Sequence, residues 1–203
     1  MNKKKPSAIA IISSTGGPQA LQVLFAGLKH KMPGIPIFIT QHMPPVFTKN
    51  LAHNLSLQHN IQCHEAEDGM EVKSGHVYIA PGDFHMLVKG DEARVRISID
   101  NGEKENFCRP SAEPMLRCLD EVYGGNLLVI ILTGMGRDGI SAAKQIARNG
   151  GTIIVQDESS SVVWGMPGAA FAENIASGVY PIGKIAREVI RICGYGRVKN
   201  APQ

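Results

Sequence analysis

Short apolar, β-rich runs alternate with helix-compatible segments along most of the 203-residue chain, and this alternation restricts the fold more than any other feature. The pattern is typical of parallel strands joined by crossover helices. We therefore predict an α/β fold, with one doubly wound, mainly parallel sheet and helices on both faces. Strands are expected near residues 8–13, 35–40, 61–65, 76–80, 127–132 and 152–156, and helices near residues 18–30, 45–58, 111–123, 139–149 and 181–193.

The segment from His85 to Ile99 departs from this pattern, because two strand-like runs flank the turn-forming residues Lys89-Gly90-Asp91. This arrangement predicts an antiparallel hairpin outside the main sheet. The chain shows no internal repeat and no linker long enough to divide it, so residues 1–203 should form a single domain. Residues 1–7 are expected to be a basic tail, and residues 194–203 a loosely held one.

Composition and charge exclude several classes of protein. The chain is 43% hydrophobic and 19% charged, so it can bury a substantial core. Its net charge of +3 lies partly in Lys3-Lys4-Lys5 and gives no indication of a nucleic-acid partner. No apolar run approaches the ~20 residues of a membrane helix, and the N-terminus lacks the apolar region of a secretion signal. We expect a soluble, cytoplasmic monomer without membrane insertion.

The cysteines and histidines predict no metal site. The four cysteines have no CxxC spacing, so neither a disulfide framework nor a thiolate zinc site is indicated. The spacing of His53, His59, Cys63 and His64 matches no recognised ligand set. We therefore expect neither a metal nor an organic cofactor.

Polar groups follow three of the predicted strands, and the carboxyl ends of parallel strands open onto one edge of a sheet. The first group is the turn Ser13 to Gly17, before a helix that starts near Pro18. The free amides of a helix N-terminus can hold a phosphate or a developing oxyanion. The turn has neither the GxGxxG of a dinucleotide loop nor the GxxxxGK[ST] of a P-loop, so nucleotide binding is the weaker alternative.

The other two groups are His42, in the loop Thr40 to Pro45, and Asp138, in the loop Leu132 to Gly139. Each has an ordinary structural alternative: a loop histidine, and an aspartate that caps the following helix. Together with the serines of the first turn they supply a nucleophile, a base and a carboxylate that orients the base. Since the base must be neutral, activity should rise with pH through roughly 6 to 7. Spacing alone leaves this triad a hypothesis.

Six separate blocks of the chain closely resemble the catalytic domain of the chemotaxis protein-glutamate methylesterase family. In chain order they are SSTGGP, TQHMPP, GHVYIAPGDFHM, RPSAEPML, LTGMGRDG and QDESSSVVWGMPGAA. The resemblance implies a parallel α/β sheet with an antiparallel hairpin, and a catalytic triad of Ser14, His42 and Asp138. It places the oxyanion hole at the backbone around Met135 and at the turn Thr15-Gly16.

The resemblance also implies an activity and a partner. The family hydrolyses γ-methyl esters of glutamate on the cytoplasmic helices of methyl-accepting chemotaxis receptors, and many members deamidate glutamines there. Members usually read GASTGG at the nucleophile, whereas Ile12 and Ser13 replace the first glycine and the alanine here. A β-branched residue at that point can alter the turn, so the alternative is a catalytically weakened regulatory or binding module of the same fold.

Members commonly carry an N-terminal receiver domain, and the few residues before Ser7 cannot form one. We therefore expect an activity that is not gated by phosphorylation within this chain. Two further blocks have more than one interpretation. Arg109, Pro110 and Ser111 suit either recognition of an acidic receptor surface or a helix cap at Ser111, and Trp164 suits either the core or a contact surface.

Overall fold

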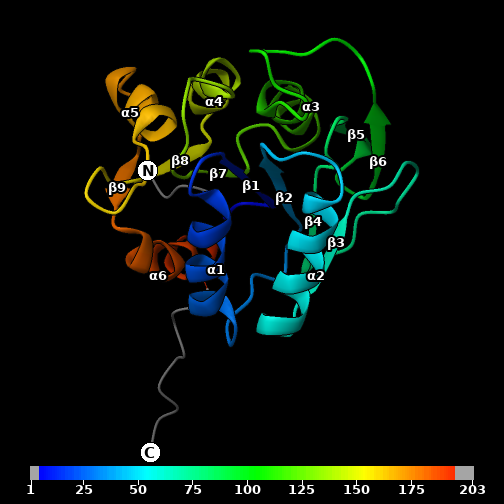
Figure 1. Cartoon of the computed structure of the whole chain (residues 1–203), viewed down its shortest axis with the longest axis horizontal. Coiled ribbons are helices and arrows are strands. Elements are labelled where there is room, and N and C mark those ends of the chain that lie inside the picture. The colour runs from blue at the N-terminus through cyan, green and yellow to red at the C-terminus, as the bar shows by residue number, and fades with distance from the viewer. Residues whose placement is uncertain (1–4, 195–203) are drawn as a thin grey trace, which may run out of the picture.

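The computed structural model describes residues 5–194 and contains a parallel sheet of seven strands (Figure 1). The strands are β1 (Ala8–Ser13), β2 (Ile37–Gln41), β3 (Gln62–Glu65), β4 (His76–Ile79), β7 (Leu127–Ile131), β8 (Thr152–Gln156) and β9 (Gly178–Tyr180). Their order across the sheet is β3-β4-β2-β1-β7-β8-β9, so β1 is the central strand. All six residues of β1 are buried, as expected for a strand covered on both faces.

Helices cover both faces of the sheet, which confirms the predicted doubly wound α/β fold (Figure 1). One face carries α1 (Gly17–Leu28), α2 (Phe47–His59) and α6 (Ile182–Cys193), and the other carries α3 (Ala112–Tyr123), α4 (Ile140–Arg148) and α5 (Gly165–Ala172). Successive side chains of β1 alternate between the two apolar cores, because side chains in a strand point to opposite faces. Among residues 5–194 no helix is long and apolar enough to cross a membrane.

The predicted hairpin is present as β5 (His85–Asp91) and β6 (Arg94–Asp100), which pair in antiparallel register and pack on α3. Its turn was misplaced: Lys89-Gly90-Asp91 are the last three residues of β5 and pair with β6, and the turn is Glu92-Ala93. The reason lies in Asp91, whose Oδ1 accepts the backbone N–H groups of Ala93 (2.9 Å) and Arg94 (3.1 Å) and so fixes the reversal after it.

Two short elements, α5 and β9, were not predicted. They follow a serine-rich loop, and α5 contains Gly165, Pro167 and Gly168, so it has weak helical patterning. Of the predicted tails, residues 1–4 and 195–203 lie outside the described residues. Pro6 is buried and Ser7 N–H donates to Asn126 O (2.7 Å), so the chain is attached to the domain before β1 begins.

The connections of β1 and β7 run to opposite faces of the sheet. These two strands are neighbours, with Ile12 paired to Ile131, yet β1 leads into α1 on one face and β7 leads into α4 on the other. Ligands of open α/β sheets bind in the crevice outside the carboxyl ends of strands at such a switch point. Ser14 follows β1 and Asp138 follows β7 at this point, and His42 follows β2 on the other side of β1.

Candidate active site

The two serines at the end of β1 have different surroundings. Ser13 is fully buried, and its Oγ donates to Gln41 Oε1 (2.7 Å). Ser14 is half-buried, and its backbone N–H donates to Thr133 O (3.0 Å). Gln41 Nε2 donates to Ser14 O (3.0 Å), so the same amide fixes both serines. Since the Ser13 hydroxyl is enclosed and engaged, these surroundings support Ser14 as the nucleophile.

Two glycines allow the backbone to come close to Ser14. Gly16 has φ of 81°, and this left-handed turn leads the chain from β1 into α1. A Cβ at Gly134 would lie 2.8 Å from Ser14 Cβ and 2.6 Å from Met166 Sδ. The loop after β7 can therefore pass beside the serine only because this position lacks a side chain.

Backbone donors of the predicted oxyanion hole lie on these two loops. Within residues 5–194, the N–H groups of Thr15, Gly16 and Met135 donate to no backbone carbonyl. The first turn of α1 contains no acidic residue and no side-chain cap that would compete for an anion. Met135 is 72% exposed, and the predicted role involves only its backbone N–H. The arrangement suits stabilisation of a developing oxyanion.

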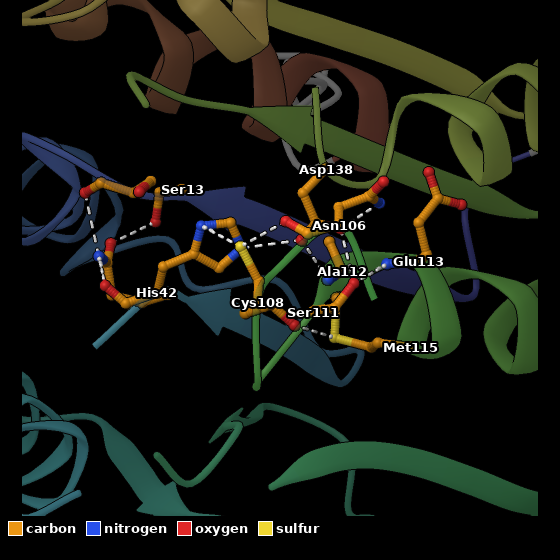
Figure 2. Close-up of polar contacts among 12 residues, drawn as sticks. Ser13, His42, Asn106, Cys108, Ser111, Ala112, Glu113, Met115 and Asp138 are labelled. Atoms are coloured by element: carbon orange, nitrogen blue, oxygen red, sulfur yellow. Dashed lines mark hydrogen bonds and ion pairs between the residues drawn. The ribbon is translucent and has the colours of Figure 1, made fainter. Parts of the chain in front are cut away.

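His42 and Asp138 are brought together by the fold: His42 Nε2 lies 2.7 Å from Asp138 Oδ2 (Figure 2). Asp138 is 2% exposed and accepts three further hydrogen bonds. Its donors are Ala112 N–H (2.6 Å), Ser111 Oγ (2.6 Å) and Asn106 Nδ2 (3.0 Å). Four donors therefore hold one buried carboxylate against the imidazole.

Asp138 does not cap the helix that follows it, which was the structural alternative. The N-cap of α4 is Gly139, without a side-chain hydrogen bond, and the helix start that Asp138 satisfies is that of α3, at Ala112. In exchange, Glu113 of α3 accepts the backbone N–H groups of Ser141 and Ala142 in the first turn of α4 (2.9 Å each). The two helices thus satisfy each other's N-termini, and this exchange fixes the carboxylate in place.

Ser111 is the predicted cap of α3, since its side chain accepts Glu113 N–H (3.2 Å). The other residues of that block are not free for an acidic partner, because Arg109 is bound to Asp83 (2.9 Å) and to the carbonyls of Asn101 and Gly102. Trp164 is half-buried, its Nε1 donates to Gln156 O (3.3 Å), and its ring lies 5.8 Å from that of Phe171.

The His42–Asp138 pair shifts the pKa of both groups. Burial opposes a charge on His42, but hydrogen bonds to Asp138 and Cys108 outweigh it and raise the pKa of the imidazole to about 9. Burial also opposes the charge on Asp138, but the donors His42, Ala112, Ser111 and Asn106 hold its pKa below the usual value. The raised pKa favours the protonated form of His42 at neutral pH, and His42 must lose this proton before it can act as a base.

The free imidazole nitrogen, His42 Nδ1, lies 3.7 Å from Cys108 Sγ. In the described part of the chain no hydrogen bond joins Ser14 Oγ to His42, so the structure forms one of the two links of the predicted triad. Sequence reasoning missed Asn106 and Cys108. Both come from the irregular loop before α3, where no periodic pattern marks them.

His42, Cys108 and Asp138 are also the only group of three metal-ligating residues within residues 5–194, with ligand atoms within 4.8 Å of one another. A metal would have to compete with the four donors of Asp138, one of which is His42 Nε2. Two of the three histidines weighed as ligands in the sequence are engaged elsewhere, since His59 pairs with Gln22 Oε1 (2.7 Å) and His64 with His76 (3.2 Å), and the third, His53, is exposed on α2.

Comparisons with known proteins show the family of this chain. Residues 9–189 match the CheB methylesterase family. The chain is 48% identical over 187 residues to a protein-glutamate methylesterase/protein-glutamine glutaminase of Nitrobacter winogradskyi, which covers 92% of this chain and 44% of that protein. An enzyme of the same name from Azospirillum brasilense is 50% identical over 184 residues, which covers 89% of this chain and 46% of that protein. The chain thus spans about half the length of the curated relatives it matches.

A solved structure matches over almost the whole chain. The crystal structure of the Thermotoga maritima CheB methylesterase catalytic domain superposes with a TM-score of 0.87 at 40% sequence identity. The match covers 93% of this chain and 100% of that one.

Proposed function

The chain belongs to the CheB methylesterase family, and from this premise we propose that it is a cytoplasmic serine hydrolase acting on chemoreceptor helices. Its reactions would be hydrolysis of glutamyl γ-methyl esters and deamidation of glutamine side chains, as the names of its relatives indicate for those proteins. The observation that carries the proposal is the hydrogen-bonded His42–Asp138 pair, which lies at the sheet edge where Ser14 follows the central strand.

The first half of the reaction forms an acyl-enzyme. Ser14 Oγ attacks the side-chain carbonyl of the substrate while His42 accepts the hydroxyl proton. Since Asp138 engages Nε2, the nitrogen that accepts this proton is Nδ1. The hydrogen bond from Ser14 forms in the substrate complex, because catalytic contacts of apo enzymes often tighten only there. His42 then returns the proton to the departing methanol or ammonia, which leaves the glutamyl group as an ester on Ser14.

The second half releases the product. His42 Nδ1 takes a proton from a water molecule, the hydroxide attacks the acyl-enzyme carbonyl, and the proton passes to Ser14 Oγ as the ester bond breaks. The products are a free glutamate carboxyl group and the regenerated serine. In both halves the backbone N–H groups of Thr15, Gly16 and Met135 are proposed to stabilise the tetrahedral oxyanion. Asp138 keeps the proton of neutral His42 on Nε2 and stabilises the imidazolium.

The packing of Ile12 supports an active enzyme over the weakened module. Ile12 is fully buried and pairs with Thr40 and Ile131 in the regular register of β1. Its Cδ1 lies beside Gly139, where a side chain would approach within 2.8 Å. The β-branched residue is thus absorbed by the core, and the chain turns only after Ser13.

The test is methanol release from methylated chemoreceptor membranes. Ser14→Ala should abolish release and leave the melting temperature unchanged, since the residue is half-buried and its hydroxyl holds no structural contact in the described chain. Ser13→Ala is the matched control, and it should retain most of the activity. Full activity in Ser14→Ala, or loss of activity only in Ser13→Ala, would contradict the assignment of the nucleophile.

A further inference from the structure

A two-residue turn beside the active site holds its residues in an unfavourable conformation. Glu105 N–H donates to Cys108 O (3.2 Å) and Cys108 N–H donates to Glu105 O (2.9 Å), which closes a hairpin turn over Asn106 and Phe107. Their φ angles are 50° and 64°. Two successive positive φ angles are typical of a type I′ turn, which favours asparagine followed by glycine. A phenylalanine in this position is strained.

The same turn positions side chains at the catalytic pair. Asn106 Nδ2 donates to Asp138 Oδ1 (3.0 Å), and Cys108 Sγ lies 3.7 Å from His42 Nδ1 (Figure 2). Phe107, between them, is 97% exposed and has no ring contact with another described aromatic side chain. Because the residue is 97% exposed, its ring buries almost no surface within residues 5–194 that would compensate for the strained backbone. Strained residues of this kind concentrate at functional sites.

Phe107 borders the approach to His42. The two residues line one cavity of about 320 Å³, together with an apolar wall formed by Met43, Pro44 and Pro45. A substrate side chain that reaches His42 from this side passes the Phe107 ring. The cavity is large enough for a few side chains and too open to enclose a small free ligand, which fits a segment of a protein substrate.

Val46, which immediately precedes α2, is a second exposed apolar residue with a positive φ angle. It is 68% exposed with φ of 73°, and it follows the loop that carries His42. For a β-branched residue this φ is a marked outlier. A second exposed apolar side chain on a strained backbone thus adjoins Pro45, which lines the same cavity as Phe107, and this supports contact with a partner.

We propose that Phe107 is a docking residue for the protein substrate. Its ring packs against an apolar side chain that lies about one turn from the modified glutamate or glutamine on the substrate helix. Side chains three or four positions apart on a helix are ~5–6 Å apart at Cβ, so both can enter the region between Phe107 and His42. This inference rests on the proposed function, since it takes the occupant of the cavity to be the segment that carries the reacting group.

The test separates docking from chemistry with Phe107→Gly. Because Asn-Gly is the preferred type I′ pair, the melting temperature should stay the same or rise by roughly 2–4 °C. Labelling of Ser14 by a small fluorophosphonate should keep its parental rate. For methanol release from methylated chemoreceptor membranes, kcat/KM should fall roughly ten-fold, mainly through KM. Phe107→Tyr should keep kcat/KM near the parental value. The control Leu57→Ala, which removes another exposed apolar side chain (68% exposed) near the end of α2, should leave kcat/KM unchanged.

Two results would overturn the proposal: an unchanged kcat/KM in Phe107→Gly, or an equal slowing of fluorophosphonate labelling, which would mean that the residue acts on the catalytic pair. Co-sedimentation of the Ser14→Ala protein with the same membranes measures docking without turnover. Adding Phe107→Gly should weaken this binding, whereas equal binding contradicts the proposal. If the parent protein releases no methanol but binds through Phe107, the proposed function fails and the docking surface stands.

Discussion

Replacing Asp138 by asparagine keeps the shape of the side chain and exchanges one acceptor oxygen for an NH₂ group. Oδ2 accepts from His42 Nε2 (2.7 Å) and Ala112 N–H (2.6 Å), and Oδ1 accepts from Ser111 Oγ (2.6 Å) and Asn106 Nδ2 (3.0 Å). In either orientation the new NH₂ group faces two donors. The less costly orientation directs it at Oδ1's partners, because the Ser111 hydroxyl can rotate and accept.

The expected size of the effect follows from this count. One buried donor left without an acceptor costs ~1–3 kcal/mol, and the loss of charge weakens the remaining bonds. We expect the free energy of unfolding to fall by about 2–3 kcal/mol, which lowers the melting temperature by roughly 4–12 °C in a domain of this size. Turnover should fall by roughly 10³–10⁴-fold, because the imidazolium formed in the reaction loses its counter-charge.

Methanol release and thermal unfolding measure the two effects separately. Asp68→Asn is the control, since it removes the same charge from an exposed site where, among the described residues, Asp68 Oδ1 accepts one hydrogen bond, from Ile99 N–H (3.0 Å). The pKa of Asp138 is lowered in the folded protein, so its contribution to stability is present at neutral pH and is lost on acidification. The difference in melting temperature should therefore shrink below about pH 4. Turnover of Asp138→Asn within ten-fold of the parent would refute the role of this carboxylate.

Three further changes test other parts of the site. Because the pKa of His42 is raised to about 9, the rate of fluorophosphonate labelling should rise with pH and reach half its maximum near pH 9, above the ordinary histidine range. Cys108→Ala should move this midpoint to lower pH, and a flat rate between pH 6 and about 9 would exclude His42 as the base. Glu113→Gln leaves one N-terminal amide of α4 without a full acceptor, so the free energy of unfolding in urea should fall by about 1–2 kcal/mol, and an unchanged midpoint would contradict the exchange between α3 and α4. Gly134→Ala brings a methyl group within 2.8 Å of Ser14 Cβ and should slow fluorophosphonate labelling roughly ten-fold or more, whereas the control Gly183→Ala, at a glycine with open space around it, should not. Equal labelling rates in the two variants would mean that the loop after β7 does not constrain Ser14.

The fold was largely predictable because its signal is local. Strands buried on both faces are continuous apolar runs, and the segments between them are long enough for crossover helices, so β1, β2, β7 and β8 were assigned from sequence. The errors also have local causes. The hairpin turn depends on one side-chain bond of Asp91, and α5 and β9 lie in a segment whose glycine, proline and serine content predicts a loop.

The site was predictable only in part, because two kinds of information define it. The parallel topology brings the ends of β1, β2 and β7 to one edge, so a serine of the turn Ser13 to Gly17, His42 and Asp138 could be proposed from position, and the family resemblance then selected Ser14. The partners of Asp138 could not be predicted in this way, because Asn106 lies in the irregular loop before α3 and Ala112 begins α3, 32 and 26 residues before Asp138 in the chain. Likewise, the raised pKa of His42 depends on tertiary contacts that spacing does not encode.

The most direct measurement is the position of a covalent adduct. The folded protein is treated with a fluorophosphonate, which phosphonylates an activated serine and releases fluoride, and the modified residue is identified by peptide mass spectrometry. We expect one adduct on Ser14, with labelling lost in His42→Ala and strongly slowed in Asp138→Asn. An adduct on Ser13 or Cys108, or labelling of Ser14 that persists at the parental rate in His42→Ala, would contradict this expectation.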